Sequence, residues 1–198
     1  MRLLESRTYR ILEVCTNFVL LNLLWLAACV PAVTAFPATA AMFGVVRDWS
    51  RGRESGILGP FWRYLRENFL QALLASIVWA LVGAVLAANL LFIRQTDSAT
   101  VSILFSVLAT LLALAYAAAS VYLFPVMVNY EADWRTVLKN SLLFALGHLG
   151  TTLLGLLVIG VAALAALFSP VTLLASGSVT AYLVYRLCDG TFHRFESS

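Results

Sequence analysis

Charged residues are scarce in this chain. Asp, Glu, Lys and Arg together make up 12% of its 198 residues, whereas a typical soluble domain has about 25%. Long polar stretches are also lacking, and the longest, residues 47–68, is interrupted by apolar and aromatic side chains. These absences exclude a separate water-soluble catalytic domain, and we expect residues 1–198 to form a single integral membrane domain.

Cysteine and histidine are rare as well, which argues against redox and metal chemistry. The three cysteines (Cys15, Cys29 and Cys188) lie in or beside apolar runs and form no Cys-x-x-Cys pair, so no disulfide framework is expected. The two histidines, His148 and His193, form no His-Glu-x-x-His motif, and Gly-x-Ser-x-Gly is absent from the sequence. We therefore expect no metal, no cofactor and no catalytic residues, and do not predict an enzyme.

Long apolar runs are what the chain has instead. Hydrophobic residues make up 62% of it, and the mean hydropathy is +0.90. About 20 apolar residues in a helix cross the hydrocarbon core of a bilayer. We predict an all-α, polytopic transmembrane helical bundle of six membrane segments. The segments are Ile11–Val30, Val33–Val46, Phe69–Ile93, Ala99–Phe124, Asn140–Phe168 and Pro170–Leu187.

The basic residues predict how the chain threads through the membrane. If the N-terminus is inside and each run crosses once, 12 of the 13 Lys and Arg residues are cytoplasmic and only Arg94 is outside. We expect a multi-pass protein of the cell membrane with both termini cytoplasmic. The start of the chain has the basic residues of a signal peptide, but its apolar run continues into further apolar sequence, so we predict a retained span.

The second segment is short and interrupted by prolines. As a helix, Val33–Val46 rises about 21 Å, less than the roughly 30 Å of the hydrocarbon core. Pro31 and Pro37 each remove a backbone donor, and the freed backbone groups need partners away from lipid. We predict an elbow in which the hydroxyl of Thr34 or Thr39 supplies such a partner, with helix resuming near Pro37.

A basic-aromatic phrase occurs twice, as "WRYLREN" from Trp62 and "WRTVLKN" from Trp134. Both copies precede a long apolar run and have Phe-Pro and Asp-Trp pairs nearby. We interpret this as a weak internal duplication. In each copy, one helix ends at the cytoplasmic face, a short segment lies at the membrane interface, and a second helix leads back into the membrane.

Two functions are open for these phrases. Trp and Arg favour the headgroup layer, which predicts a membrane-surface anchor. Trp, Tyr and Arg are also enriched at binding hot spots, which predicts a docking surface. The candidate contact residues are Trp62, Arg63, Asn68, Trp134, Arg135 and Asn140. Nucleic acid is not an expected partner, because membrane topology already explains the arginines.

Three stretches of the first 75 residues form a recognisable pattern: "NLLW" at Asn22–Trp25, the elbow from Pro31 to Ala41, and the Phe61–Ala72 entry to the next span. This part of the chain resembles the YesL-like family of bacterial membrane proteins. Phe36 departs from the small residue usual there. The family is of unknown function, and its members are often encoded beside carbohydrate-import ABC transporters. The resemblance therefore implies an accessory role in carbohydrate uptake and supplies no catalytic residues.

We accordingly expect an accessory or assembly subunit of a membrane transport complex. Its partners would be the lipid bilayer and the permease or ATPase subunits of an ABC importer. The chain does not contain the Glu-Ala-Ala-x-x-x-Gly loop of a permease, so it is not expected to be the permease itself. The alternative is an independent small-solute transporter or channel. Its polar path would use Asn17, Asn22, Asn89 and His148.

Overall fold

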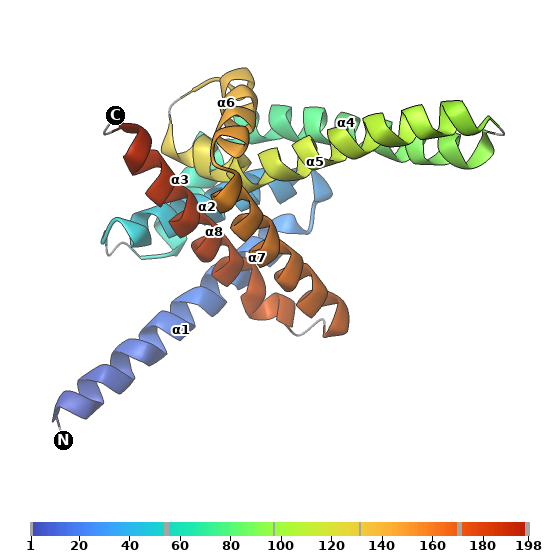
Figure 1. The fold of residues 1–198 in the computed structure, drawn as a ribbon. Helices are drawn as coiled ribbons and strands as arrows, with labels where there is room; N and C mark the ends of the chain where they lie inside the picture. The colour runs from blue at the N-terminus through green and yellow to red at the C-terminus, as the bar shows by residue number, and fades with distance from the viewer. Residues whose placement is uncertain (1, 54–55, 97, 131, 170–171, 197–198) are drawn as a thin grey trace.

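The computed structural model describes residues 2–53, 56–96, 98–130, 132–169 and 172–196, and the described chain is helical with no strand (Figure 1). The prediction of an all-α protein is therefore confirmed. The elements, in chain order, are α1 (Arg2–Cys29), the 3-10 turn η1 (Ala32–Thr34), α2 (Ala35–Ser50), α3 (Leu58–Glu67), α4 (Phe69–Gln95), α5 (Ala99–Asn129), α6 (Trp134–Gly147), α7 (Leu149–Phe168) and α8 (Leu173–Glu196).

Four of these helices are long and apolar enough to cross a membrane. They are α1, through its Leu12–Cys29 portion, and α4, α5 and α7 over their full lengths. The predicted second segment, Val33–Val46, corresponds to η1 and α2. The predicted sixth, Pro170–Leu187, lies almost entirely in α8, which begins at Leu173, and its residues 170 and 171 are outside the described part of the chain. Neither is among the four helices found in the described residues. Membrane-crossing length and composition thus support four spans, while the six-segment threading and the cytoplasmic termini stay predictions.

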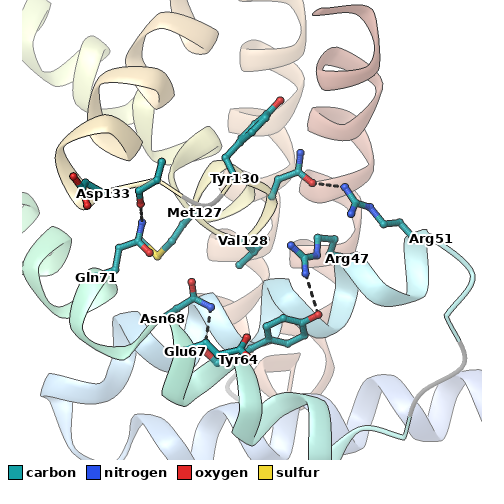
Figure 2. Close-up of a pocket in the computed structure, with 12 residues that line it drawn as sticks. Arg47, Arg51, Tyr64, Glu67, Asn68, Gln71, Met127, Val128, Tyr130 and Asp133 are labelled. Carbon is teal, nitrogen blue, oxygen red and sulfur yellow. Dashed lines mark hydrogen bonds between the residues drawn. The ribbon is translucent and has the colours of Figure 1, made fainter. Parts of the chain in front are cut away.

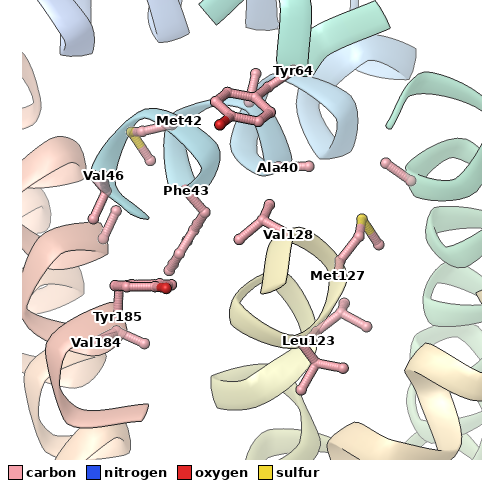
Figure 3. Close-up of a cluster of buried hydrophobic side chains, with 14 of the residues drawn as sticks. Ala40, Met42, Phe43, Val46, Tyr64, Leu123, Met127, Val128, Val184 and Tyr185 are labelled. Atoms are coloured by element: carbon pink, nitrogen blue, oxygen red, sulfur yellow. The ribbon is translucent and has the colours of Figure 1, made fainter. Parts of the chain in front are cut away.

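Helix α2 lies at the centre of the molecule. It packs against α1, α3, α4, α5 and α8, and most of its side chains are buried. Figure 3 shows the apolar cluster there, with Phe43 and Val46 of α2 facing Val128 of α5 and Tyr185 of α8. Because protein rather than lipid surrounds it, α2 can be short, about 24 Å for its 16 residues.

The remaining helices extend outward from this centre as arms. The α4–α5 hairpin, the α7–α8 pair and the first part of α1 point away from it in different directions (Figure 1). Large apolar side chains such as Leu81, Ile103 and Leu157 are exposed along these arms. Exposed apolar surface of this extent suits contact with lipid tails, which are as apolar as leucine.

The elbow between α1 and α2 has the local bonds that its prolines require. The Thr34 hydroxyl donates to the carbonyl of Ala28 at 2.5 Å and to that of Pro31 at 2.7 Å. The Ala28 carbonyl is one of those that the end of α1 leaves without helical partners, whereas the Pro31 carbonyl lies outside α1 and also accepts the backbone N–H of Thr34 at 2.9 Å. Helix resumes at Ala35, two residues before Pro37, so the proline lies in the first turn, where its missing N–H has no cost.

The prediction of one continuous fifth segment, Asn140–Phe168, was wrong. The chain has two helices there, α6 and α7, separated at His148, whose φ and ψ are −132° and 60°. Helix α7 alone has 20 residues and rises about 30 Å, enough to cross the hydrocarbon core. His148 therefore lies at one end of a candidate span, and Asn140 lies within α6 instead of starting a span.

Helix α5 continues through Pro125 to Asn129, five residues beyond the predicted end. A proline at this position cannot donate to the carbonyl four residues earlier, that of Val121. The thiol of Cys188 on α8 donates to this carbonyl at 3.9 Å. The buried Cys188 thus has a bonding role in addition to the apolar filling expected from the sequence.

The element order supports a repeated topology. In α2–α3–α4 and again in α5–α6–α7, a helix is followed by a shorter one, a break and a long apolar helix. The breaks fall at Asn68 and at His148, so the two Trp-Arg phrases are not in equivalent register. Asn68 occupies its break, whereas Asn140 is in the middle of α6.

Candidate functional site

Asp48, near the end of α2, is the centre of a polar cluster. Its carboxylate is 2% exposed, and its Oδ2 accepts a hydrogen bond from the Tyr64 hydroxyl at 2.8 Å. The guanidinium of Arg63 lies 3.4 Å from Oδ2, and that of Arg53 lies 3.5 Å from Oδ1. A buried carboxylate needs such partners, because removing it from water is costly. Asp48 therefore joins α2 to α3 and to the connection between them.

Tyr64 is the second member of this Asp48 cluster. Its buried hydroxyl also accepts a hydrogen bond from Nη2 of Arg47 at 3.0 Å, so it bonds to a carboxylate and a guanidinium at once. Its ring lies directly against Gly44 of α2, where a Cβ atom would overlap the ring carbons. The missing side chain of Gly44 is what lets α3 approach α2 so closely.

Arg63, one of the predicted contact residues, contacts members of this cluster with part of its side chain. It pairs with Asp48, lies 3.9 Å from Glu67 and covers the Tyr64 ring at 4.8 Å from the ring centroid. Tyr64, and to a smaller extent Asp48 and Glu67, raise the pKa of Arg63. Its side chain is nevertheless 54% exposed, so one side of the guanidinium remains available to a partner.

A cavity of about 650 Å³ lies beside the Asp48 cluster (Figure 2). Its walls come from the end of α2, the α3–α4 break, the end of α5 and the residues before α6. They are lined by Arg47, Arg51, Tyr64, Glu67, Asn68, Gln71, Met127, Val128, Asn129, Tyr130, Ala132 and Asp133. The cavity thus lies between the α2–α4 segment and the end of α5 with the residues before α6, and most of its lining is polar or charged.

Hydrogen bonds join the segments that surround this cavity. Arg51, the residue after α2, donates to Oδ1 of Asn129 on α5 at 2.5 Å, and the Tyr185 hydroxyl of α8 donates to the same oxygen at 3.3 Å. On another wall, the Gln71 amide of α4 donates to the Ala132 carbonyl at 2.5 Å. Figure 2 shows the Arg51 and Gln71 bonds on different sides of the space.

The structure brings only one of the six predicted contact residues into the cavity lining, namely Asn68. Trp62 is 50% exposed on the outer side of α3, and Arg135 lies over the ring of its neighbour Trp134 at 5.1 Å. Asn140 is partly buried on α6. Within the described residues α3 and α6 make no contact with each other, so the two phrases form separate surfaces.

The elbow residues lie at the opposite end of α2 from the cavity. Thr39 accepts a hydrogen bond from the Trp25 indole at 3.0 Å and donates to the Ala35 carbonyl at 2.7 Å. Pro37 is buried at the start of α2, whereas Pro31 is exposed. These contacts fix how α1 meets α2 and assign the elbow a structural role.

The four residues of the alternative polar path lie in three different places: Asn17 and Asn22 on α1, Asn89 on α4, and His148 between α6 and α7. Asn22 of α1 accepts the backbone N–H of Ser178 on α8 at 3.1 Å, a helix-to-helix bond. Asn89 lies on α4, which among the described residues contacts neither α1 nor α8. Asn17 borders a second groove of about 820 Å³ between α1 and the α2–α3 connection, and His148 is at the α6–α7 break. These positions do not form one continuous path.

Sequence reasoning missed most of the Asp48 cluster and of the cavity. Asp48 enters the sequence-based predictions only as part of a repeated Asp-Trp pair, and Arg47, Tyr64 and Asn129 are not among the predicted site residues. A usable signal was present: an acidic residue ends an apolar segment between arginines, which predicts a paired buried charge. Within the described part of the chain, no group of three or more His, Cys, Asp or Glu is placed to hold a metal ion.

Comparison with known proteins confirms the resemblance seen in the sequence. Residues 18–90 match the family described as "Protein of unknown function, DUF624". The chain is 29% identical to Bacillus subtilis (strain 168) YteU over 75% of this chain and 68% of that protein. It is 26% identical to YesL of the same organism over 89% and 85% of the two chains. It is also 30% identical to YesV over 67% and 65%.

All three relatives carry the description "Uncharacterized protein", so they supply a family and no activity. No solved structure matches the chain.

Proposed function

We propose that this chain, which matches the YesL-like family, is an accessory or assembly subunit of a membrane transport complex. The partner we propose is a permease or ATPase subunit of an ABC importer for carbohydrates, which follows from what the resemblance implies about neighbouring genes. The docking surface is the outer face of α3, with α6 presenting a second such surface.

The observation that supports this proposal is the half-exposed Trp62 on a firmly held helix. The inner face of α3 is buried through Phe61, Tyr64 and Leu65, and the Asp48 cluster bonds it to α2. Trp62 and the exposed parts of Arg63 therefore face outward from a rigid support. Interface hot spots are rich in large aromatic side chains and arginine. Side chains that are already ordered before binding lose less conformational entropy when the partner binds.

The test is recovery of partner subunits with the purified chain. The tagged protein is extracted from its native membranes in a mild detergent, and co-purifying proteins are quantified by mass spectrometry. Truncating one hot-spot residue removes about 2 kcal/mol or more of binding free energy, and such losses are not additive. Trp62→Ala with Trp134→Ala should therefore weaken binding of a transporter subunit, and lower its recovery, at least about thirtyfold.

A matched control is available on the same helix. Leu58 is 55% exposed on α3 but carries no aromatic ring, so Leu58→Ala should leave partner recovery unchanged. Unchanged recovery with the double tryptophan variant, at normal expression, would contradict the docking role. It would favour the membrane-anchor interpretation. That interpretation predicts that the double tryptophan variant binds the membrane surface more weakly, while the ratio of partner subunits to the purified chain stays the same.

A further inference from the structure

The cavity beside the Asp48 cluster has an unusual distribution of charge. Four charged side chains line it: Arg47 of α2 and Arg51 directly after it, Glu67 at the end of α3, and Asp133 before α6. Asp48, the nearest buried carboxylate, is engaged by Tyr64, Arg63 and Arg53. The carboxylate that could have neutralised the arginines of α2 is thus already bonded to other groups.

The two arginines of the cavity have only neutral partners among the described residues. Arg47 donates through Nη2 to the Tyr64 hydroxyl, and its buried Nε has no hydrogen-bond acceptor. Arg51 donates to the side-chain oxygen of Asn129 and makes no ion pair within the described chain. Both come from one end of α2, four residues apart, and extend toward the same space (Figure 2).

Guanidinium groups that converge on a cavity and form no ion pair with a carboxylate of the described chain suit an anionic oxygen group. Arginine binds carboxylate and phosphate through paired N–H donors, and such charge-assisted bonds are stronger than neutral ones. On the other side, Glu67 and Asp133 can only accept hydrogen bonds when ionised. They disfavour a second negative group and favour hydroxyl or ammonium donors on the ligand.

We propose that this cavity binds a small solute or headgroup bearing one phosphate or carboxylate together with hydroxyl or ammonium donors. The anionic group lies between Arg47 and Arg51, and the donors face Glu67 and Asp133. Because Arg47 and Arg51 lie at the end of α2 and Asp133 precedes α6, a ligand that binds both the arginines and Asp133 adds a link between α2 and the α5–α6 connection. The proposal requires no protein partner and stands apart from the docking function.

Thermal unfolding of the purified full chain tests the site, with glycerol 3-phosphate as the probe because it carries both a phosphate and hydroxyl groups. Sodium chloride at equal ionic strength corrects for general screening. At ten times its Kd, a ligand shifts the folded-to-unfolded ratio about elevenfold, which raises the Tm by about 4 °C for a chain of this size. We expect this rise in the unmodified protein and not with glycerol.

Substitutions locate the binding. Arg51→Gln, which removes one guanidinium at the exposed rim, should abolish the rise, and Arg47→Gln should do the same if it folds. Arg66→Gln is the control, because Arg66 is exposed on α3 and does not line the cavity. An equal rise in Arg51→Gln, or no rise in the unmodified protein with glycerol 3-phosphate or in anionic bilayers, overturns the proposal.

Bilayer composition identifies the source of the anion. In nanodiscs, phosphatidylglycerol presents a net negative headgroup whose glycerol carries free hydroxyl donors. The phosphate of phosphatidylcholine is esterified to choline, a quaternary ammonium that makes the headgroup neutral overall and has no hydrogen-bond donor. A Tm difference between the unmodified protein and Arg51→Gln that appears only in phosphatidylglycerol assigns the site to a lipid headgroup. A rise with soluble glycerol 3-phosphate in phosphatidylcholine nanodiscs assigns it to a solute. Partner recovery is a separate measurement, so failure here leaves the docking proposal unaffected.

Discussion

The contacts of the Asp48 cluster indicate that one atom, the hydroxyl oxygen of Tyr64, contributes substantially to the stability of the protein. Tyr64→Phe keeps the ring that packs against Gly44 and removes only the hydroxyl. Two bonds are lost with it, the 2.8 Å bond to Asp48 and the 3.0 Å bond from Arg47. The substitution therefore isolates the polar contribution of this side chain from its packing.

The magnitude follows from the burial of the partners. A hydrogen bond to a charged group contributes about 1.5–3 kcal/mol to stability, and a buried acceptor left without its donor adds a desolvation cost. Asp48 is buried, but Arg63 and Arg53 are more than half exposed, so their ion pairs with it are screened and contribute less than about 1 kcal/mol each. They cannot replace the lost hydroxyl. We expect Tyr64→Phe to lower the free energy of unfolding by about 2–3 kcal/mol.

Thermal unfolding in detergent, followed by circular dichroism, measures this effect. For a chain of about 200 residues, 2–3 kcal/mol corresponds to a fall in Tm of about 4–12 °C. Tyr116→Phe is the control, since the Tyr116 ring stacks on Trp79 and its hydroxyl makes no hydrogen bond with the described residues.

The effects of Tyr64→Phe and Asp48→Asn on stability should also depend on each other. Because Tyr64 acts through Asp48, Tyr64→Phe in an Asp48→Asn background should cost much less than in the unmodified protein. A fall in Tm for Tyr64→Phe no larger than that of Tyr116→Phe, or full additivity with Asp48→Asn, would refute the role assigned to this bond.

Two further predictions concern packing and topology. Gly44→Ala places a methyl group into the Tyr64 ring, so we expect it to destabilise the protein by about 1–3 kcal/mol. Gly160→Ala has open space around the new Cβ and should be neutral or stabilising. Unfolding measurements compare the two variants. The predicted threading places Arg94 outside the cell and Arg66 inside it. The test uses a chain whose own cysteines are replaced by serine, into which a single cysteine is introduced. An impermeant maleimide should label Arg94→Cys on intact cells and Arg66→Cys only after permeabilisation. Labelling of both on intact cells would refute the orientation.

Much of the fold could be predicted because its determinants are local. The apolar lengths around Phe69–Ile93 and Ala99–Phe124 identify helices that the structure has as α4 and α5. Pro31 and Pro37 likewise predict a break that appears between α1 and α2. The break at His148 was missed, because Gly147 and the leucines around it keep the hydropathy continuous and no proline marks the position.

The candidate site was harder to predict because its contacts are distant in the sequence. Asn129 meets Arg51 and Tyr185, which lie 78 and 56 residues away, and Gln71 meets Ala132 at a separation of 61. None of these residues has a spacing that indicates its partner. Only Asn68, through its place in a repeated phrase, was both predicted and found in the cavity lining.

The sequence by itself determined that this is an all-helical chain with several helices able to cross a membrane, and where its charges gather. Those properties depend on apolar length and composition, which each segment carries alone. Tertiary structure decided that the short α2 lies in the centre, that Cys188 bonds to the Val121 carbonyl opposite Pro125, and that Asp48 joins α2 to α3. It also decided where Arg47 and Arg51 converge. These outcomes depend on which helices pack together, and a polar group buried by that packing must bond to whatever its neighbours present.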